Sequence, residues 1–133
     1  MYIVQKLDTL KTPLVNKFYA QNNVRGRANK QDQVWVVYNK MQVVAACRIQ
    51  NKHDFLFLST VFVDPQHRKK GLAKQLLCAA VKQQTMPLYT FAYTHLTRLY
   101  MALGFNQVLT YTPGLKALFD IYAHRNIVAL EYL

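Results

Sequence analysis

The feature that most constrains this sequence is residues 55–81, where a strand pattern gives way to a helix pattern across a short basic turn. Residues 55–63 are rich in β-branched and aromatic side chains, and Asp64-Pro65 ends the strand because proline has no N–H to give a β-ladder. From Gly71 onward, apolar side chains recur at steps of three and four residues, which predicts a helix with one buried face. A strand, a turn and a helix therefore form the centre of the chain.

The turn between these two elements has the composition of an anion-binding site. Residues 67–70, HRKK, are followed by the small residues Gly71 and Ala73. The first N–H groups of a helix have no partner within it and lie at the positive end of its dipole, so they attract anions. Small side chains let a phosphate approach this backbone, and the neighbouring cations add countercharge. An ordinary basic loop is the alternative interpretation of the same composition.

The remaining apolar patterns predict strands on both sides of this centre. These strands are expected at residues 2–7, 34–38, 42–49, 88–93, 105–111 and 127–133. Residues 39–41 form the turn of a hairpin, and residues 112–126 connect the last two strands with at most a brief helix. The strand at 88–93 is reached from the central strand through a helix, so the two are expected to be parallel.

One further helix is predicted near the start of the chain, at residues 9–20, with a cap at Asp8 or Thr9. Its spacing is expected to bury Leu10, Leu14, Phe18 and Tyr19 on one side. The polar residues 21–33 that follow are interpreted as a loop or a broken second helix. They contribute Arg25, Arg27 and Lys30 but only Asp32, a balance that is poorly suited to attract a polycation.

Two motifs resemble those of the GNAT N-acetyltransferases. Residues 63–73 read VDPQHRKKGLA, and from Arg68 they are similar to the family's acetyl-coenzyme A signature, Gln/Arg-x-x-Gly-x-Gly/Ala. Residues 99–105 read LYMALGF and are similar to the Leu-Tyr-x-x-Leu-Gly-Phe of a later helix in the family, expected here at 96–103 and closed by Gly104. The likeness covers roughly the C-terminal two thirds of the chain.

The resemblance implies a mixed α/β fold for the whole chain, residues 1–133, as a single domain. Its sheet would have about six to seven strands, antiparallel in the first part, with parallel fourth and fifth strands that splay apart. An extended ligand with amide groups can pair with the free end of the fourth strand. Acetyl-CoA is the ligand implied, and the residues expected to bind it are Phe62, Val63, Arg68, Lys69, Lys70, Gly71, Leu72, Ala73 and Lys74.

The chemistry implied by the resemblance is direct attack of an amine on the acetyl thioester. Tyr100 matches the family's tyrosine, which protonates the departing thiol, although its place in a helical apolar stripe also fits a core residue. Tyr93 lies seven residues before Tyr100, where many members of the family carry an asparagine that supports the coenzyme. This difference puts one coenzyme contact in doubt.

No general base is identified from the sequence. Asp and Glu residues are scarce, and none has an obvious position at the open end of the sheet. Histidine is a common general base, so a histidine and a water relay remain alternatives. The chain has four histidines, His53, His67, His95 and His124.

The composition predicts a globular cytoplasmic protein without a bound metal. No apolar run approaches the roughly 20 residues needed to span a bilayer, and the first residues lack the apolar centre of a signal peptide. Cys47 and Cys78 have no metal-binding spacing and are interpreted as small buried hydrophobic residues. Nothing in the sequence distinguishes a monomer from a homodimer.

The charge is the least expected property, with 17 Lys and Arg against 6 Asp and Glu and a formal net charge of +11. Such an excess favours a second anionic partner such as RNA, although the cations are spread evenly and also fit a simply basic surface. The predicted function is acetyl transfer from acetyl-CoA to a primary amine of an unidentified acceptor. The alternatives are an acceptor associated with RNA or the ribosome, and a module that binds acetyl-CoA without catalysis.

Overall fold

The computed structural model describes residues 1–133 and contains one seven-stranded sheet with the order β1-β2-β3-β4-β5-β7-β6. The strands are β1 (Tyr2–Lys6), β2 (Gln33–Asn39), β3 (Gln42–Asn51), β4 (Leu56–Val63), β5 (Leu88–Tyr93), β6 (Asn106–Gln107) and β7 (Ile127–Tyr132). Only β4 and β5 run parallel, and all other neighbours are antiparallel. The predicted mixed sheet with a parallel fourth and fifth strand is confirmed.

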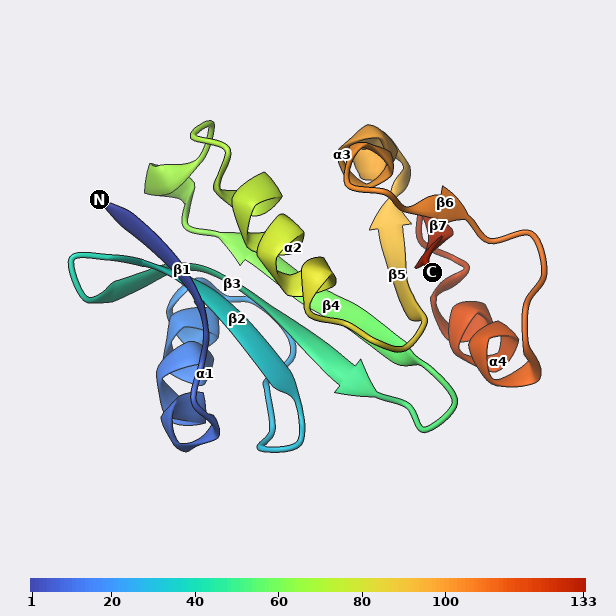
Figure 1. Ribbon diagram of the computed structural model, residues 1–133, viewed down its shortest axis with the longest axis horizontal. Coiled ribbons are helices and arrows are strands. Elements are labelled where there is room, and N and C mark those ends of the chain that lie inside the picture. Colours follow the sequence, from blue (N-terminus) through green and yellow to red (C-terminus); the bar gives the residue numbers. More distant parts are fainter.

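Four α-helices cover the sheet, two on each face (Figure 1). They are α1 (Thr12–Gln21), α2 (Leu72–Lys82), α3 (Thr97–Ala102) and α4 (Pro113–Tyr122). Helices α2 and α3 pack on one face, whereas α1 and α4 pack on the other at opposite ends of the sheet. Short 3-10 helices precede α1, α2 and α3, at Thr9–Lys11, Pro65–His67 and Thr94–Leu96.

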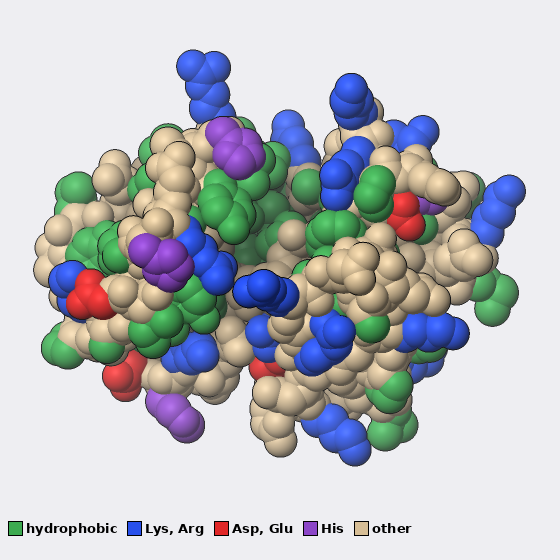
Figure 2. All heavy atoms as spheres, turned by 180° about the vertical axis from the view of Figure 1, so that it is seen from behind, with side chains coloured by type: hydrophobic (Ala, Val, Ile, Leu, Met, Phe, Trp, Pro, Cys, Tyr) green, Lys and Arg blue, Asp and Glu red, His purple; other side chains and the backbone are tan.

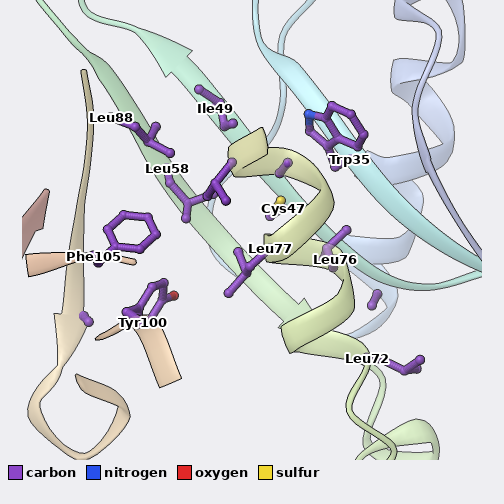
Figure 3. Close-up of a cluster of buried hydrophobic side chains, with 14 of the residues drawn as sticks. Trp35, Cys47, Ile49, Leu58, Leu72, Leu76, Leu77, Leu88, Tyr100 and Phe105 are labelled. Atoms are coloured by element: carbon purple, nitrogen blue, oxygen red, sulfur yellow. The ribbon is translucent and has the colours of Figure 1, made fainter. Parts of the chain in front are cut away.

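The largest core lies between α2 and the sheet (Figure 3). Leu76 and Leu77 of α2 are fully buried against strand residues that include Cys47 and Leu58. Burial of each such leucine contributes about 2 kcal/mol to the free energy of folding. Cys47 is buried as predicted, whereas Cys78, on α2, is only partly buried.

The buried face of α1 differs from the prediction. Leu10 and Leu14 are 80% and 47% exposed, and Val15 is buried beside Phe18 and Tyr19. The reason is that the first residues form a separate 3-10 helix, capped by Asp8, so the α-helix begins later. Val15 then lies three and four residues before the two aromatic side chains, which is the spacing of one helix face.

The C-terminal part is also corrected by the structure. The strand predicted at residues 105–111 is only the two-residue β6, and the connection after it contains the ten-residue helix α4. Thr112 caps this helix by accepting a hydrogen bond from the Leu115 N–H, with Pro113 in the first turn. Phe105 and Val108 are buried as core residues on either side of the short strand.

Strands β4 and β5 separate beyond the first three residues of each. Their pairing begins at Leu56 and Leu88 and ends at Leu58 and Thr90, and the two arrows in Figure 1 diverge toward their tips. Thr60 has a φ of 54°, and the register between β3 and β4 shifts at this point, as in a β-bulge that bends a strand. The second half of β4 is therefore free of any neighbour on the β5 side.

Candidate active site

The separation of β4 from β5 opens a cleft of about 1120 Å³. Its walls include eight of the nine residues predicted to bind acetyl-CoA, and also Tyr100. Lys70 is the predicted residue that does not line it. The structure thus brings the two motifs of the sequence, which are distant along the chain, to one cavity.

The N-terminus of α2 forms one end of this cleft. Gly71 precedes the helix with a φ of 74°, and no side chain caps the helix. The first intrahelical bond runs from the Gln75 N–H to the Gly71 carbonyl, so the N–H groups of residues 72–74 have no partner within the helix. A Cβ built at Gly71 would meet no atom within 4 Å. The position therefore favours glycine through its positive φ, and no protein atom obstructs the approach of a ligand to this backbone.

At the end of β4, the main chain of Val63 faces the cleft. The Asp64 N–H donates to the Val44 carbonyl at 2.8 Å, which turns residue 64 toward β3. In an antiparallel ladder the direction alternates, so the N–H and C=O of Val63 point away from β3, whereas those of Phe62 point toward it. Of the two predicted residues, Val63 offers its main chain to a ligand.

Arg68 lies across this free end. Its Nε donates to the Val63 carbonyl at 3.0 Å, and its guanidinium carbon is 5.2 Å from the centre of the Phe62 ring. Lys69 and Lys74 also line the cleft. The Val63 carbonyl thus accepts one hydrogen bond within the protein and keeps a second lone pair for a ligand.

Tyr100, on α3, lies on the α2 side of the sheet, in the core that joins β1–β4 to β5–β7 (Figure 3). The residue is 5% exposed, and its ring packs edge-on against Phe105 with 5.5 Å between ring centres. Its hydroxyl makes no hydrogen bond within the protein and is not enclosed, and the residue lines the cleft. Burial, and secondarily the Cys47 thiol, raises the pKa of Tyr100 to about 12. The hydroxyl is thus protonated at neutral pH and free to donate.

No carboxylate lines the cleft, and two of the four histidines do. His67 is hydrogen-bonded through Nδ1 to the Tyr2 hydroxyl at 2.9 Å, which connects the turn before α2 to β1. His95 stacks on Tyr93, with 6.0 Å between ring centres. The remaining histidines, His53 and His124, lie outside the cleft. No group of three or more His, Cys, Asp or Glu residues is arranged to hold a metal.

The face of the sheet opposite α2 contributes a part of the cleft that the sequence revealed only in part. Arg48, on β3, lies there together with Arg25 from the loop after α1 and Arg125 from the turn after α4. Figure 2 shows this face, where Lys and Arg side chains surround a hollow between the two halves and acidic side chains are few. The sequence singled out Arg25 and the shortage of acids around it, whereas Arg48, within the apolar run VVAACRI, and Arg125 were not identified.

Solved structures of other proteins share this fold at low sequence identity. ElaA from Escherichia coli is 17% identical over 100% of both chains, with a TM-score of 0.68. An acyl-CoA N-acyltransferase from Pseudomonas aeruginosa is 14% identical over 100% of both chains, with a TM-score of 0.68. The PaiA N-acetyltransferase from Thermoplasma acidophilum, solved in complex with coenzyme A, is 10% identical over 99% of this chain and 98% of its own, with a TM-score of 0.62.

The sequence also matches a known domain directly. No curated protein sequence gives a significant match. None of the helices has the length and apolar character required to cross a membrane. A family model described as the acetyltransferase (GNAT) domain matches residues 30–107, which include β2 to β6 and most of the cleft. The chain therefore belongs to the GNAT acetyltransferase family, whose members are acyl-CoA-dependent N-acyltransferases.

Proposed function

We propose that this protein transfers the acetyl group of acetyl-CoA to a primary amine. One observation carries the proposal: the free end of β4, the unpaired N–H groups of α2 and the Tyr100 hydroxyl all open into one cleft. The complex of the PaiA N-acetyltransferase with coenzyme A supports the choice of cosubstrate. The continuous sheet further supports the proposal that residues 1–133 form a single domain.

Acetyl-CoA fits this cleft as an added strand. Its pantetheine amides pair with the N–H and C=O of Val63, in the place that β5 leaves open. Its pyrophosphate binds the N–H groups of residues 72–74, where the helix dipole favours an anion. Arg68, Lys69 and Lys74 add countercharge at this end.

The reaction is a single displacement at the thioester. The amine nitrogen attacks the carbonyl carbon, the resulting tetrahedral intermediate loses its C–S bond, and an amide and coenzyme A are formed. The ammonium proton passes to water or to His95, the cleft histidine that no hydrogen bond engages. Tyr100 donates its hydroxyl proton to the departing sulfur, a role that its pKa of about 12 permits because the hydroxyl is protonated at neutral pH.

A Tyr100→Phe variant tests this mechanism. We expect release of free coenzyme A with a supplied amine to slow at least tenfold, while the Kd for acetyl-CoA measured by calorimetry stays within a factor of two. Tyr132→Phe is the matched control, because its ring also packs against Phe105 but does not line the cleft. Equal turnover in the wild type and the Tyr100→Phe variant would remove this tyrosine from the mechanism.

A second acceptor class is an amine on a protein associated with RNA, which the net charge of +11 favours. Binding to a mixed RNA is then expected to weaken steeply between 50 and 200 mM salt, by about a factor of 10³ for a protein that makes several phosphate contacts. Absence of RNA binding at 50 mM salt would dismiss this class.

A further inference from the structure

The cleft has an unusual charge balance for an enzyme whose acceptor is an ammonium ion in water. Its cationic side chains are Arg25, Arg48, Arg68, Lys69, Lys74 and Arg125, and no Asp or Glu lines it. Three of these cations lie near α2, where the coenzyme phosphates are proposed to bind. The other three, Arg25, Arg48 and Arg125, belong to the opposite end, where no phosphate of the cosubstrate is needed.

Arg48 is held in a fixed position at this second end. Its Nε donates to Thr60 Oγ1 at 2.9 Å, and its Nη1 donates to Asp32 Oδ2 at 3.2 Å. The two charged side chains are 13% and 4% exposed. The remaining nitrogen, Nη2, has no partner in the protein and lies 3.4 Å from a Cβ built at Gly26. It is a pre-oriented donor of the type that binds carboxylates and phosphates.

Arg25 and Arg125 supply charge that no acid neutralises. The ion pairs of the structure are Asp32 with Arg48 and Asp120 with Lys116, so neither of these arginines has a carboxylate partner. Arg25 precedes Gly26, which lies against the Arg48 guanidinium. Arg125 follows α4, and its guanidinium carbon is 5.2 Å from the centre of the Tyr122 ring. The charge thus comes from both walls of the cleft.

We infer that the acceptor is a small amine that carries an anionic group, a carboxylate or a phosphate, and that Arg25, Arg48 and Arg125 bind this group. The inference rests on the proposed acetyl transfer and names its substrate class. A simple amine or a polyamine would meet only like charge here, whereas an anionic group offsets it. The same cations disfavour the ammonium form of the bound amine, which agrees with the lack of a carboxylate base.

The test is a matched series of acceptors with acetyl-CoA as donor. The acidic probe 4-aminobutanoate is compared with the neutral 4-aminobutanamide and the cationic 1,4-diaminobutane, which have similar lengths. The compound 2-aminoethyl phosphate is compared with ethanolamine. We expect kcat/KM to be at least tenfold higher for the acidic member of each set. The better of the two acidic probes distinguishes a carboxylate site from a phosphate site.

Variants locate the preference within the cleft. Arg125→Gln is expected to lower the ratio of kcat/KM for the acidic probe to kcat/KM for the neutral amide about tenfold. Arg98→Gln is the control, because Arg98 is exposed on α3, makes no ion pair and does not line the cleft. A preference that survives Arg125→Gln and Arg25→Gln together would overturn the assignment to these residues.

The outcomes separate this inference from the proposed function. Equal or better use of the neutral or cationic probes would overturn the inference and leave acetyl transfer intact. No transfer to any of the five probes, in a protein that binds acetyl-CoA by calorimetry, would also overturn it. Failure to bind acetyl-CoA at all would overturn the proposed function and the inference with it.

Discussion

At the α2 end of the cleft, the groups that hold a ligand in place are mainly backbone groups, the N–H groups of residues 72–74 and the main chain of Val63, and the cationic side chains there add countercharge. At the opposite end the groups available to a ligand are side chains, those of Arg25, Arg48 and Arg125. A backbone site depends on the shape of one turn and tolerates changes of side chain. A side-chain site depends on residue identity and on segments far apart in the sequence. One fold can therefore keep its cosubstrate while its acceptor changes.

The largest expected effect is on the free energy of unfolding, because Arg48 also neutralises a buried carboxylate. Arg48→Gln leaves the buried Asp32 carboxylate without a countercharge, and we expect a loss of about 3 kcal/mol in the free energy of unfolding, measured with urea. Adding Asp32→Asn should restore most of this loss. Lys116→Gln breaks an exposed pair with Asp120 and should cost less than about 1 kcal/mol. Equal losses in the two single variants would contradict the buried role of Arg48.

A smaller effect is expected on acetyl-CoA binding when only the charge of the side chain at position 71 is varied. Asn and Asp have the same shape and both tolerate the positive φ of 74° at Gly71. We expect Gly71→Asp to weaken acetyl-CoA binding about a hundredfold, or about 2.7 kcal/mol, because its carboxylate faces the phosphates. Gly71→Asn should weaken it only a few-fold. If the two variants bind equally, phosphate does not sit at this helix terminus.

The two neighbouring lysines provide the next comparison. Lys69 lines the cleft and Lys70 does not. Lys69→Gln is expected to raise the Kd for acetyl-CoA about fivefold, because an exposed countercharge contributes about 1 kcal/mol, and Lys70→Gln less than twofold. Calorimetry at two salt concentrations measures both. The reverse order would mean that the turn has a different shape in the complex.

The smallest effect is on the pH dependence of stability and concerns Tyr100, which lies between the two ends of the cleft. Its pKa is about 12 in the folded protein and near 10 when unfolded, so above pH 10 only the unfolded chain loses this proton and stability falls as pH rises. At pH 11 this contributes about 1 kcal/mol to the loss. Urea unfolding at pH 9 and pH 11 should show a smaller loss for Tyr100→Phe than for the wild type. An identical pH dependence would indicate that this hydroxyl is not buried.

The backbone end of the cleft could be predicted from the sequence because its signals are local. The strand, the proline stop and the glycine before α2 lie within residues 55–81, and the periodicity of each element can be read directly. The short turn at Lys40 and Met41 was predicted for the same reason, and both residues have positive φ. These features need no knowledge of distant contacts.

The end of the cleft that carries the three arginines was predicted only at Arg25, because the signals for the rest are long-range. Arg48 meets Asp32 across a loop and meets Thr60 on another strand, and neither partner is marked in the sequence. Thr60 is β-branched and fits a regular strand, so the bulge that places it was not foreseen. The exposed Leu14 was mistaken for a core residue because the start of α1 depends on a preceding 3-10 helix.

The most direct test of the division between the two ends is an NMR titration of 15N-labelled protein with coenzyme A. We predict shifts of the backbone amide signals of Val63 and residues 72–74, with the amides of Arg25 and Arg125 unchanged until an acidic acceptor is added. Shifts confined to the loop after α1 and the turn after α4, with none at Val63 or at the start of α2, would contradict the account.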